Sequence, residues 1–232
     1  MGTTRGWAAI AACVGAVGLT ACGGGGGDSS AGATSTAGAT DAVLRSYLDS
    51  TNVNSSSFPW NGQFPGVVKR WNLPVPVKTN GEARAVVAMN TIEARLGFTV
   101  FDRTSIEATD EAAITRGLVF RKGTSYLPAG ANPQAYCANV ANAPFSGSWP
   151  TGFLRTPGEI SARLYVNLDN PQCTASQDIA VHEVGHALGL GAHFAAFGDD
   201  APITPDVWPV LATLYGNPIG TARAAIAIRR AN

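Results

Sequence analysis

The run of residues from 182 to 193, HEVGHALGLGAH, constrains this chain more than any other feature of its sequence. The chain has three histidines, and all of them fall within this run. His182 and His186 are four residues apart, so on an α-helix they project from one face about one turn apart. The sequence therefore predicts a helix here whose two imidazoles meet at a common point.

Two histidines at this spacing are typical of a zinc site, because both can bind one ion while Glu183 lies close to its open coordination position. Gly189 and Gly191 can end the helix and turn the chain, so that His193 returns to the same ion. The alternative is a helix that carries buried, hydrogen-bonded histidines. The glycine turn and the concentration of every histidine in one run favour one Zn²⁺ bound by three imidazoles.

The composition predicts one globular domain. A chain of 232 residues that is 45% hydrophobic can bury one core, with little room for a second. Charged residues make up 14% of the chain and the formal net charge is zero. No basic run offers a phosphate-binding patch, so nucleic acid is not an expected partner. We expect a monomer.

Residues 1–21 resemble a bacterial lipoprotein signal peptide. Arg5 supplies a positive charge, and the apolar stretch from 7 to 19 is too short to span a bilayer comfortably. The stretch ends in Leu-Thr-Ala-Cys, similar to the lipobox, in which cleavage leaves the cysteine, here Cys22, as the lipidated N-terminus. An ordinary secretory signal with an incidental Cys22 is the alternative. The residue after Cys22 is glycine and not aspartate, and in this the chain resembles lipoproteins that are sorted to the outer membrane.

Three segments follow the signal. Residues 22–40 are rich in Gly, Ser and Thr, and predict a flexible tether that cannot bury enough apolar surface to fold. Residues 41–66 form an N-terminal extension, with a short helix over 41–48 and then a loop whose residues 58–60 can dock on the domain. Residues 67–232 form the domain proper.

Periodicity and turn signals predict strands and helices from residue 67 onward. Strands are expected over residues 67–71, 73–77, 98–101, 117–121 and 160–168, the last with one buried face, and loop over 123–157. A first helix is expected from a capping box at Thr79 and Glu82 to Leu96, with an apolar stripe of Ala85, Met89, Ile92 and Leu96 facing a core. Two more are expected, from a second box at Thr174 and Gln177 to about Gly189, and from Thr204-Pro205 to Gly216. This order indicates an α+β fold.

Two cysteines remain for a disulfide. Cys13 is lost with the signal and Cys22 is acylated, which leaves Cys137 and Cys173. In an oxidising compartment these two are expected to pair, tying the long loop to the residues before the second helix. A Cys137 thiolate that blocks zinc in a latent form is the alternative.

The order of elements around the histidine run resembles the metzincin zinc peptidases, and is most similar to their matrixin-like branch. The order of elements is similar over residues 67–217, but the specific motif covers only residues 182–193. A weaker similarity lies in Leu214-Tyr215-Gly216. It implies a small twisted mixed β-sheet, an N-terminal helix, an active-site helix, and a short C-terminal subdomain that ends in a helix. It further implies that the three histidines bind zinc and that Glu183 is the catalytic base.

The sequence departs from the family pattern at two points. In the family, the third ligand stands three residues after the glycine that ends the helix. In this chain Ala192 occupies that position after Gly189, and His193 lies one residue further on. Asp199 and Asp200 are the competing third ligands, and a Ca²⁺ site at this pair is conceivable but unsupported. The family also has a methionine turn beneath the metal, whereas this chain has only Met1 and Met89. We expect Phe194 or Phe197 to take that place.

Two functions follow as expectations. The first is a zinc-dependent metalloendopeptidase that hydrolyses a protein or peptide substrate, with Glu183 as general base. The second is a non-catalytic, zinc-stabilised surface lipoprotein that binds a protein or envelope partner. In both, the chain is exported to the bacterial outer membrane or cell surface, facing the periplasm or the exterior, and touches the membrane through its lipid anchor only.

Overall fold

The computed structural model describes residues 38–198 and 203–231. The signal peptide, Cys22, nearly all of the tether, Asp199 and Asp200 lie outside the described residues. No helix in the described ranges combines the length and apolar character needed to cross a membrane.

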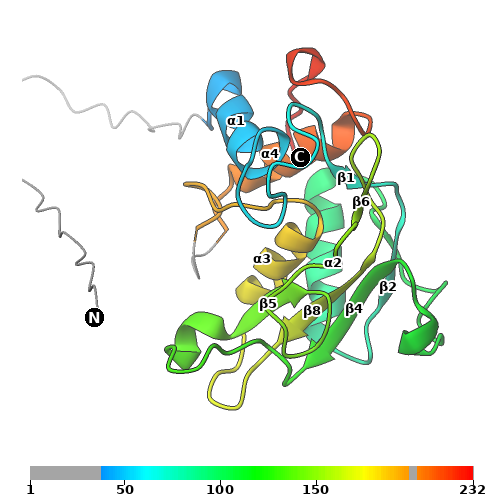
Figure 1. Cartoon of the computed structure of the whole chain (residues 1–232). Helices are drawn as coiled ribbons and strands as arrows, with labels where there is room; N and C mark the ends of the chain where they lie inside the picture. Colours follow the sequence, from blue (N-terminus) through cyan, green and yellow to red (C-terminus); the bar gives the residue numbers. More distant parts are fainter. Residues whose placement is uncertain (1–37, 199–202, 232) are drawn as a thin grey trace, which may run out of the picture. The chain divides into compact units, whose positions relative to one another are not determined.

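The described chain is a mixed α/β structure whose elements are shown in Figure 1. The α-helices are α1 (Asp41–Leu48), α2 (Ala83–Leu96), α3 (Gln177–Ala187) and α4 (Val207–Gly216). The strands are β1 (Arg70–Trp71), β2 (Val75–Lys78), β3 (Phe101–Asp102), β4 (Gly117–Lys122), β5 (Ala138–Ala141), β6 (Leu154–Arg155), β7 (Glu159–Ile160) and β8 (Arg163–Leu168). A π-helical turn (Asp49–Val53) and short 3₁₀ turns (Glu111–Ala113, Pro133–Tyr136, Arg223–Ala225) complete the list.

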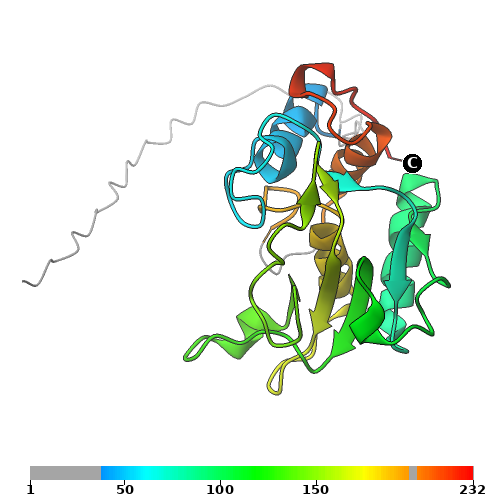
Figure 2. The same ribbon diagram turned by 45° about the vertical axis from the view of Figure 1, so that its right-hand side comes forward.

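The main sheet has the strand order β3-β2-β4-β8-β5. Its first four strands are parallel, and β4 pairs with β8 from Gly117 opposite Arg163 to Lys122 opposite Leu168. Strand β5 runs antiparallel to β8 and forms the edge. A second small sheet has the order β1-β7-β6. Helices α2 and α3 pack against each other on one face of the main sheet (Figures 1 and 2), which agrees with the expected α+β class.

Helix α2 buries the predicted apolar stripe but begins later than predicted. Its buried residues are Ala85, Ala88, Met89, Ile92 and Leu96. The capping box at Thr79 is wrong, because Asn80 and Gly81 have φ angles of 51° and 75°, which a right-handed helix does not admit. Glu82 is itself the N-cap, and its carboxylate accepts the Arg84 N–H at 3.0 Å.

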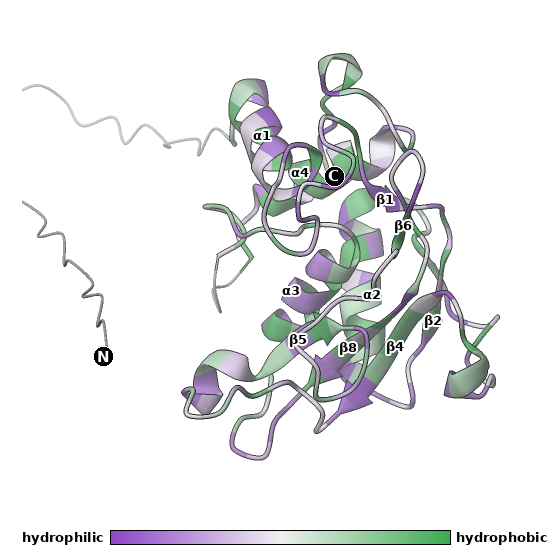
Figure 3. Ribbon diagram, viewed as in Figure 1, coloured by the Kyte–Doolittle hydropathy of each residue, from purple (hydrophilic) through white to green (hydrophobic). Residues whose placement is uncertain are grey.

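Strand β8 is buried on both faces, contrary to the predicted alternation. Each residue from Leu164 to Leu168 is buried. One face meets the helices, while on the other Tyr165 packs with Ile114 and Val119, and the Asn167 amide donates to the Ala143 carbonyl at 3.1 Å. The segments that cover this outer face come from distant parts of the chain, so the strand's own alternation did not indicate them. Neighbouring β4 is buried from Gly117 to Phe120, where Figure 3 shows mainly hydrophobic colouring, and it ends in the exposed Arg121 and Lys122.

Residues 41–66 pack into the same core as the rest of the domain. Helix α1 has the predicted bounds and buries Leu44 and Leu48. The stretch after it, expected as loop, begins with the π-helical turn and buries Val53 and Trp60 completely. This part of the chain therefore contributes to the interior, and it lies beside the turn that follows α3, as described below.

Candidate metal centre

Helix α3 presents the first half of the histidine motif. Its N-cap is Ser176, whose hydroxyl accepts the Ile179 N–H at 3.2 Å, so the capping box predicted at Thr174 is wrong. The Gln177 side chain, predicted to complete that box, instead donates to the Arg84 carbonyl of α2 at 3.2 Å. Because His182 and His186 are one turn apart on this helix, both rings extend from the same face.

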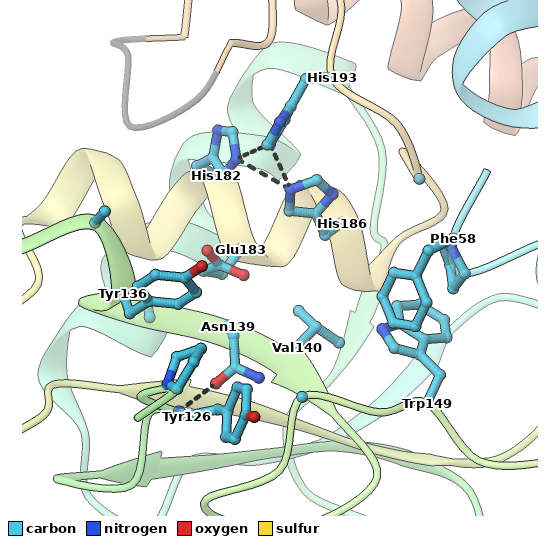
Figure 4. A pocket seen from close by; sticks show the side chains of 16 residues that line it. Phe58, Tyr126, Tyr136, Asn139, Val140, Trp149, His182, Glu183, His186 and His193 are labelled. Atoms are coloured by element: carbon cyan, nitrogen blue, oxygen red, sulfur yellow. Dashed lines mark hydrogen bonds between the residues drawn. The ribbon is translucent and has the colours of Figure 1, made fainter. Parts of the chain in front are cut away.

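The chain turns directly after α3, as the glycines predicted. Gly189 has a φ of 116°, a conformation that disfavours any residue with a side chain. The turn returns His193 to the helix, and the three imidazoles converge (Figure 4). Their Nε2 atoms are 3.0 Å apart between His182 and His186, and 3.1 Å from each of these to His193.

The three nitrogens fit one zinc ion. With zinc–nitrogen bonds of about 2.0–2.1 Å, a tetrahedral site separates its ligand atoms by about 3.3 Å, close to the spacing seen here. Three neutral imidazoles whose Nε2 lone pairs face one another repel unless a cation lies among them. The set of three histidine nitrogens is moreover the donor set that catalytic zinc accepts while it keeps one position open.

The surroundings of the rings favour their metal-binding form. The His186 Nδ1 lies 2.5 Å from the Leu190 carbonyl oxygen; donation of its proton there leaves Nε2 as the lone-pair nitrogen. Burial, together with the neighbouring imidazoles of His186 and His193, lowers the pKa of His182 to about 2. His182 is therefore neutral at physiological pH. Its Nδ1 is buried and has no hydrogen-bond partner among the described residues.

Phe197 forms the floor beneath the cluster, one of the two residues predicted for this place. Its ring is fully buried and contacts all three imidazoles, with centroids 4.1 Å from His182, 4.8 Å from His186 and 5.8 Å from His193. Phe194 instead closes a tight turn with Phe197, in which each N–H donates to the other's carbonyl, at 3.0 and 2.7 Å. A large aromatic ring thus lies beneath the cluster.

Glu183 faces the same cavity as the histidines. The cavity has a volume of about 660 Å³ and runs between α3 and strand β5. Glu183 is 8% exposed, and Figure 4 shows its carboxylate on the side of Tyr136 and Asn139. A carboxylate and three imidazoles therefore line one cleft.

Aromatic side chains line much of the rest of the cleft (Figure 4). Tyr126 and Tyr136 lie on the side of Glu183, and Phe58 and Trp149 lie near the C-terminal end of α3. The rings of Phe58 and Trp149 meet edge to face with centroids 6.2 Å apart. Apart from Glu183 and the three histidines, the described residues that line the cleft include no Asp, Glu, Lys, Arg or Cys.

Cys137 and Cys173 form a disulfide, as predicted, with Cα atoms 5.3 Å apart. Cys137 immediately precedes β5, and Cys173 lies in the loop before α3. The bond therefore links the two elements on either side of the cleft, and the latent-thiolate alternative for Cys137 is wrong in this structure.

Strand β5 and the aromatic residues are the parts of the site that the sequence did not indicate. The stretch 123–157 was predicted as loop, and a four-residue strand leaves too short an alternation to detect. Only the phenylalanine and tryptophan of residues 58–60 were expected to dock on the domain. Asp206, a further aspartate downstream of the histidine run, accepts the Ala39 N–H at 3.0 Å and is outside the cluster.

The resemblance to metzincins rests on the sequence alone: on the order of elements over residues 67–217, on the motif of residues 182–193 and, more weakly, on residues 214–216. Comparison of the chain with protein-family models, curated proteins and solved structures gives no match.

Proposed function

We propose that this protein is a zinc-dependent metalloendopeptidase of metzincin type that hydrolyses peptide bonds. The observation that carries the proposal is the presence of Glu183 in the same cleft as the three converging imidazoles. Three histidine ligands favour zinc and leave room for one further ligand. A site that served stability alone needs neither a cleft nor a carboxylate that lines the same cleft as the histidines.

Glu183 is the general base in this proposal. Bound zinc would lower the pKa of a water ligand and polarise the scissile carbonyl. Glu183 accepts the proton of the attacking water and passes it to the departing amine. The histidines hold their lone-pair nitrogens toward the cleft, and Phe197 keeps bulk water from the buried side of the cluster.

The edge strand β5 supports an extended peptide as the substrate. In the described sheet β5 has one neighbour, β8, and its residues Ala138 to Val140 line the cleft. An extended chain can pair with the outer backbone of such a strand, beside the three histidines. Because the cleft is lined by rings such as Phe58 and Tyr136, we propose that apolar or aromatic side chains flank the scissile bond.

Substitution of Glu183 by Gln tests the proposal. The purified protein is incubated with denatured casein and with a mixed peptide library, with and without a chelator. We expect chelator-sensitive cleavage by the wild type, and a loss of at least about 10²-fold in the Glu183→Gln variant, which still binds one equivalent of zinc. Glu159→Gln, at a glutamate of β7 outside the cleft lining, is the matched control. Equal cleavage by both variants would show that Glu183 is not the base.

The same experiment separates the proposal from the second function, a zinc-stabilised lipoprotein that binds a partner without cleaving it. Zinc bound at one equivalent without chelator-sensitive cleavage of any peptide would favour that function.

We also propose that the chain is a monomeric lipoprotein, anchored through Cys22 at the outer membrane or cell surface. The Cys137–Cys173 disulfide supports export, since such bonds persist in oxidising compartments. Substitution of Cys22 by Ser in the full chain should move the protein from the membrane fraction to the soluble fraction. If the variant stays with the membrane, Cys22 is not the anchor.

A further inference from the structure

The segment that precedes the predicted domain contacts the turn that carries His193. We call residues 47–60 the N-terminal segment and residues 189–194 the ligand turn. Thr51 makes two of the contacts between them. Its carbonyl accepts the Gly191 N–H at 3.0 Å, and its hydroxyl donates to the Ala192 carbonyl at 2.6 Å. The residue directly before His193 is thus held by a side chain 141 positions away in the sequence.

Asn52 holds the start of the ligand turn. Its side-chain amide donates to the Gly189 carbonyl at 2.8 Å and to the Lys69 carbonyl at 2.7 Å, while its side-chain oxygen accepts the Lys69 N–H at 2.9 Å. The Lys69 ammonium in turn donates to the backbone carbonyls of Asn52 and Val53, at 2.6 and 2.9 Å. Asn52 and Lys69 are both fully buried. This network links the N-terminal segment both to Lys69, directly before β1, and to the ligand turn.

Trp60 explains why residue 191 is glycine. Gly191 is not among the residues with positive φ, so backbone freedom is not what the position requires. A Cβ at this position would overlap the Trp60 indole and would lie 2.9 Å from the Thr51 carbonyl oxygen. The indole N–H of Trp60 donates to that same oxygen at 2.7 Å. Glycine at 191 therefore permits the N-terminal segment to lie directly against the ligand turn.

A further contact lies on the other side of His193. The ring of Tyr47 packs on the ring of Phe194, with centroids 4.9 Å apart and an interplanar angle of 31°. The residues on both sides of His193 are thus in contact with the N-terminal segment. These contacts also account for the irregular spacing of the third histidine, because the carbonyl of the additional residue, Ala192, is bound by Thr51.

We propose that the N-terminal segment is a positioning element for His193, with Thr51 and Asn52 as its positioning residues. The proposal rests on the metal site proposed above. Without these contacts the turn would lose its fixed geometry, and metal binding would have to order it. The metal affinity of the domain therefore depends on a segment that stands about 130 residues before the ligands in the sequence.

Thr51→Val tests the proposal in the full chain, since valine keeps the shape of threonine and removes the hydroxyl. The affinity for Zn²⁺ is measured by competition with a chromophoric chelator, and the visible absorption of the Co²⁺ form reports ligand geometry. We expect affinity to fall about 10- to 100-fold, as for other groups that orient metal ligands. Thr51→Ser, which restores the hydroxyl, should recover most of it. Thr91→Val, which removes a hydroxyl in a solvent-exposed hydrogen bond to the Val87 carbonyl within α2, is the matched control and should bind as the wild type does.

A thermodynamic cycle distinguishes positioning from general structural damage. In the His193→Ala background, Thr51→Val should change zinc affinity little, because the ligand that it positions is absent. An equal loss in both backgrounds overturns the proposal, as does wild-type affinity and Co²⁺ absorption in a folded Thr51→Val protein. If Thr51→Val does not fold, Tyr47→Leu tests the contact on the other side of His193; unchanged affinity there also overturns the proposal. A wild-type protein that binds no metal would instead refute the metal site itself.

Discussion

The ring of Phe197 lies flat against the imidazole of His182, with centroids 4.1 Å apart and planes inclined by 12°. The stacked ring fixes the orientation of His182 and excludes water from beneath it. A Cβ on Gly185 would lie 2.9 Å from this ring, so the absence of a side chain at Gly185 allows the ring to reach the helix. The floor of the cluster is therefore built from a small residue on α3 and a large one after the ligand turn.

Phe197→Ala should destabilise the metal-free protein by about 3–5 kcal/mol, because it leaves a cavity in the core. It should also weaken zinc binding, since His182 loses its support. The free energy of unfolding is measured in urea, and zinc affinity by chelator competition. Phe145→Ala is the matched control: its ring is 64% exposed, so we expect a change within about 0.5 kcal/mol. Equal stability of the two variants would contradict the role of Phe197.

Removal of zinc should lower the thermal stability of the protein. Zinc that binds the folded state stabilises it by about 2.7 kcal/mol at a free concentration 100 times the dissociation constant. Thermal unfolding with added zinc and with a chelator measures the difference. His193→Ala should reduce it, and replacement of all three histidines should abolish it. A zinc-dependent shift that survives the triple replacement would place the bound metal elsewhere.

The disulfide should stabilise the fold through its effect on the unfolded chain. Cys137 and Cys173 are 36 residues apart, and closing such a loop contributes about 4 kcal/mol in the chain-entropy model. Urea unfolding with and without a reductant should show this loss in the wild type. The Cys137→Ser, Cys173→Ser double variant should have the free energy of unfolding of the reduced wild type, and the reductant should not change it. A response of the double variant would point to another source of the effect.

The ion pair between Arg84 and Asp169 should make stability fall in acid. The Arg84 guanidinium donates to both Asp169 carboxylate oxygens, at 2.7 and 2.9 Å, and the Ala175 N–H donates to one of them at 2.8 Å. Burial raises the pKa of Asp169, but these hydrogen bonds outweigh it and bring the pKa below its ordinary value. Since the folded-state pKa is depressed, this stabilisation is present above pH about 4 and is lost as the pH falls through the folded-state value.

Asp169→Asn should therefore destabilise the protein by about 1.5–3 kcal/mol at pH 7, because Arg84 loses one of its two carboxylate partners and keeps only Glu82. The difference from the wild type should shrink in urea unfolding experiments below about pH 4. Asp178→Asn, at an exposed position in the first turn of α3, should change stability by less than about 1 kcal/mol. A pH-independent difference for Asp169→Asn would mean that packing, and not charge, determines its effect.

The sequence predicted well where the relevant geometry is local. Helix α1 has the expected bounds, the apolar stripe of α2 is buried, and the spacing of His182 and His186 places both on one face of α3. Helical periodicity fixes which residues share a face without reference to the rest of the chain. The first residues of the helices were less predictable. Asn80 and Gly81 have positive φ angles, so α2 begins only after them, and a capping pattern in the sequence does not indicate these angles.

By itself the sequence determined the helix that carries two imidazoles and Glu183, the glycine that ends it, and the cysteines available to pair. Only the tertiary structure decided how the site is completed: by β5 as the edge of the cleft, by Phe197 beneath His182, and by Thr51 and Asn52 on the ligand turn. The physical reason is the separation in sequence over which each interaction acts. Periodicity and turn chemistry act over a few residues, whereas the hydrogen bonds from Thr51 and Asn52 to the ligand turn join residues 141 and 137 positions apart, which only the packed chain brings together.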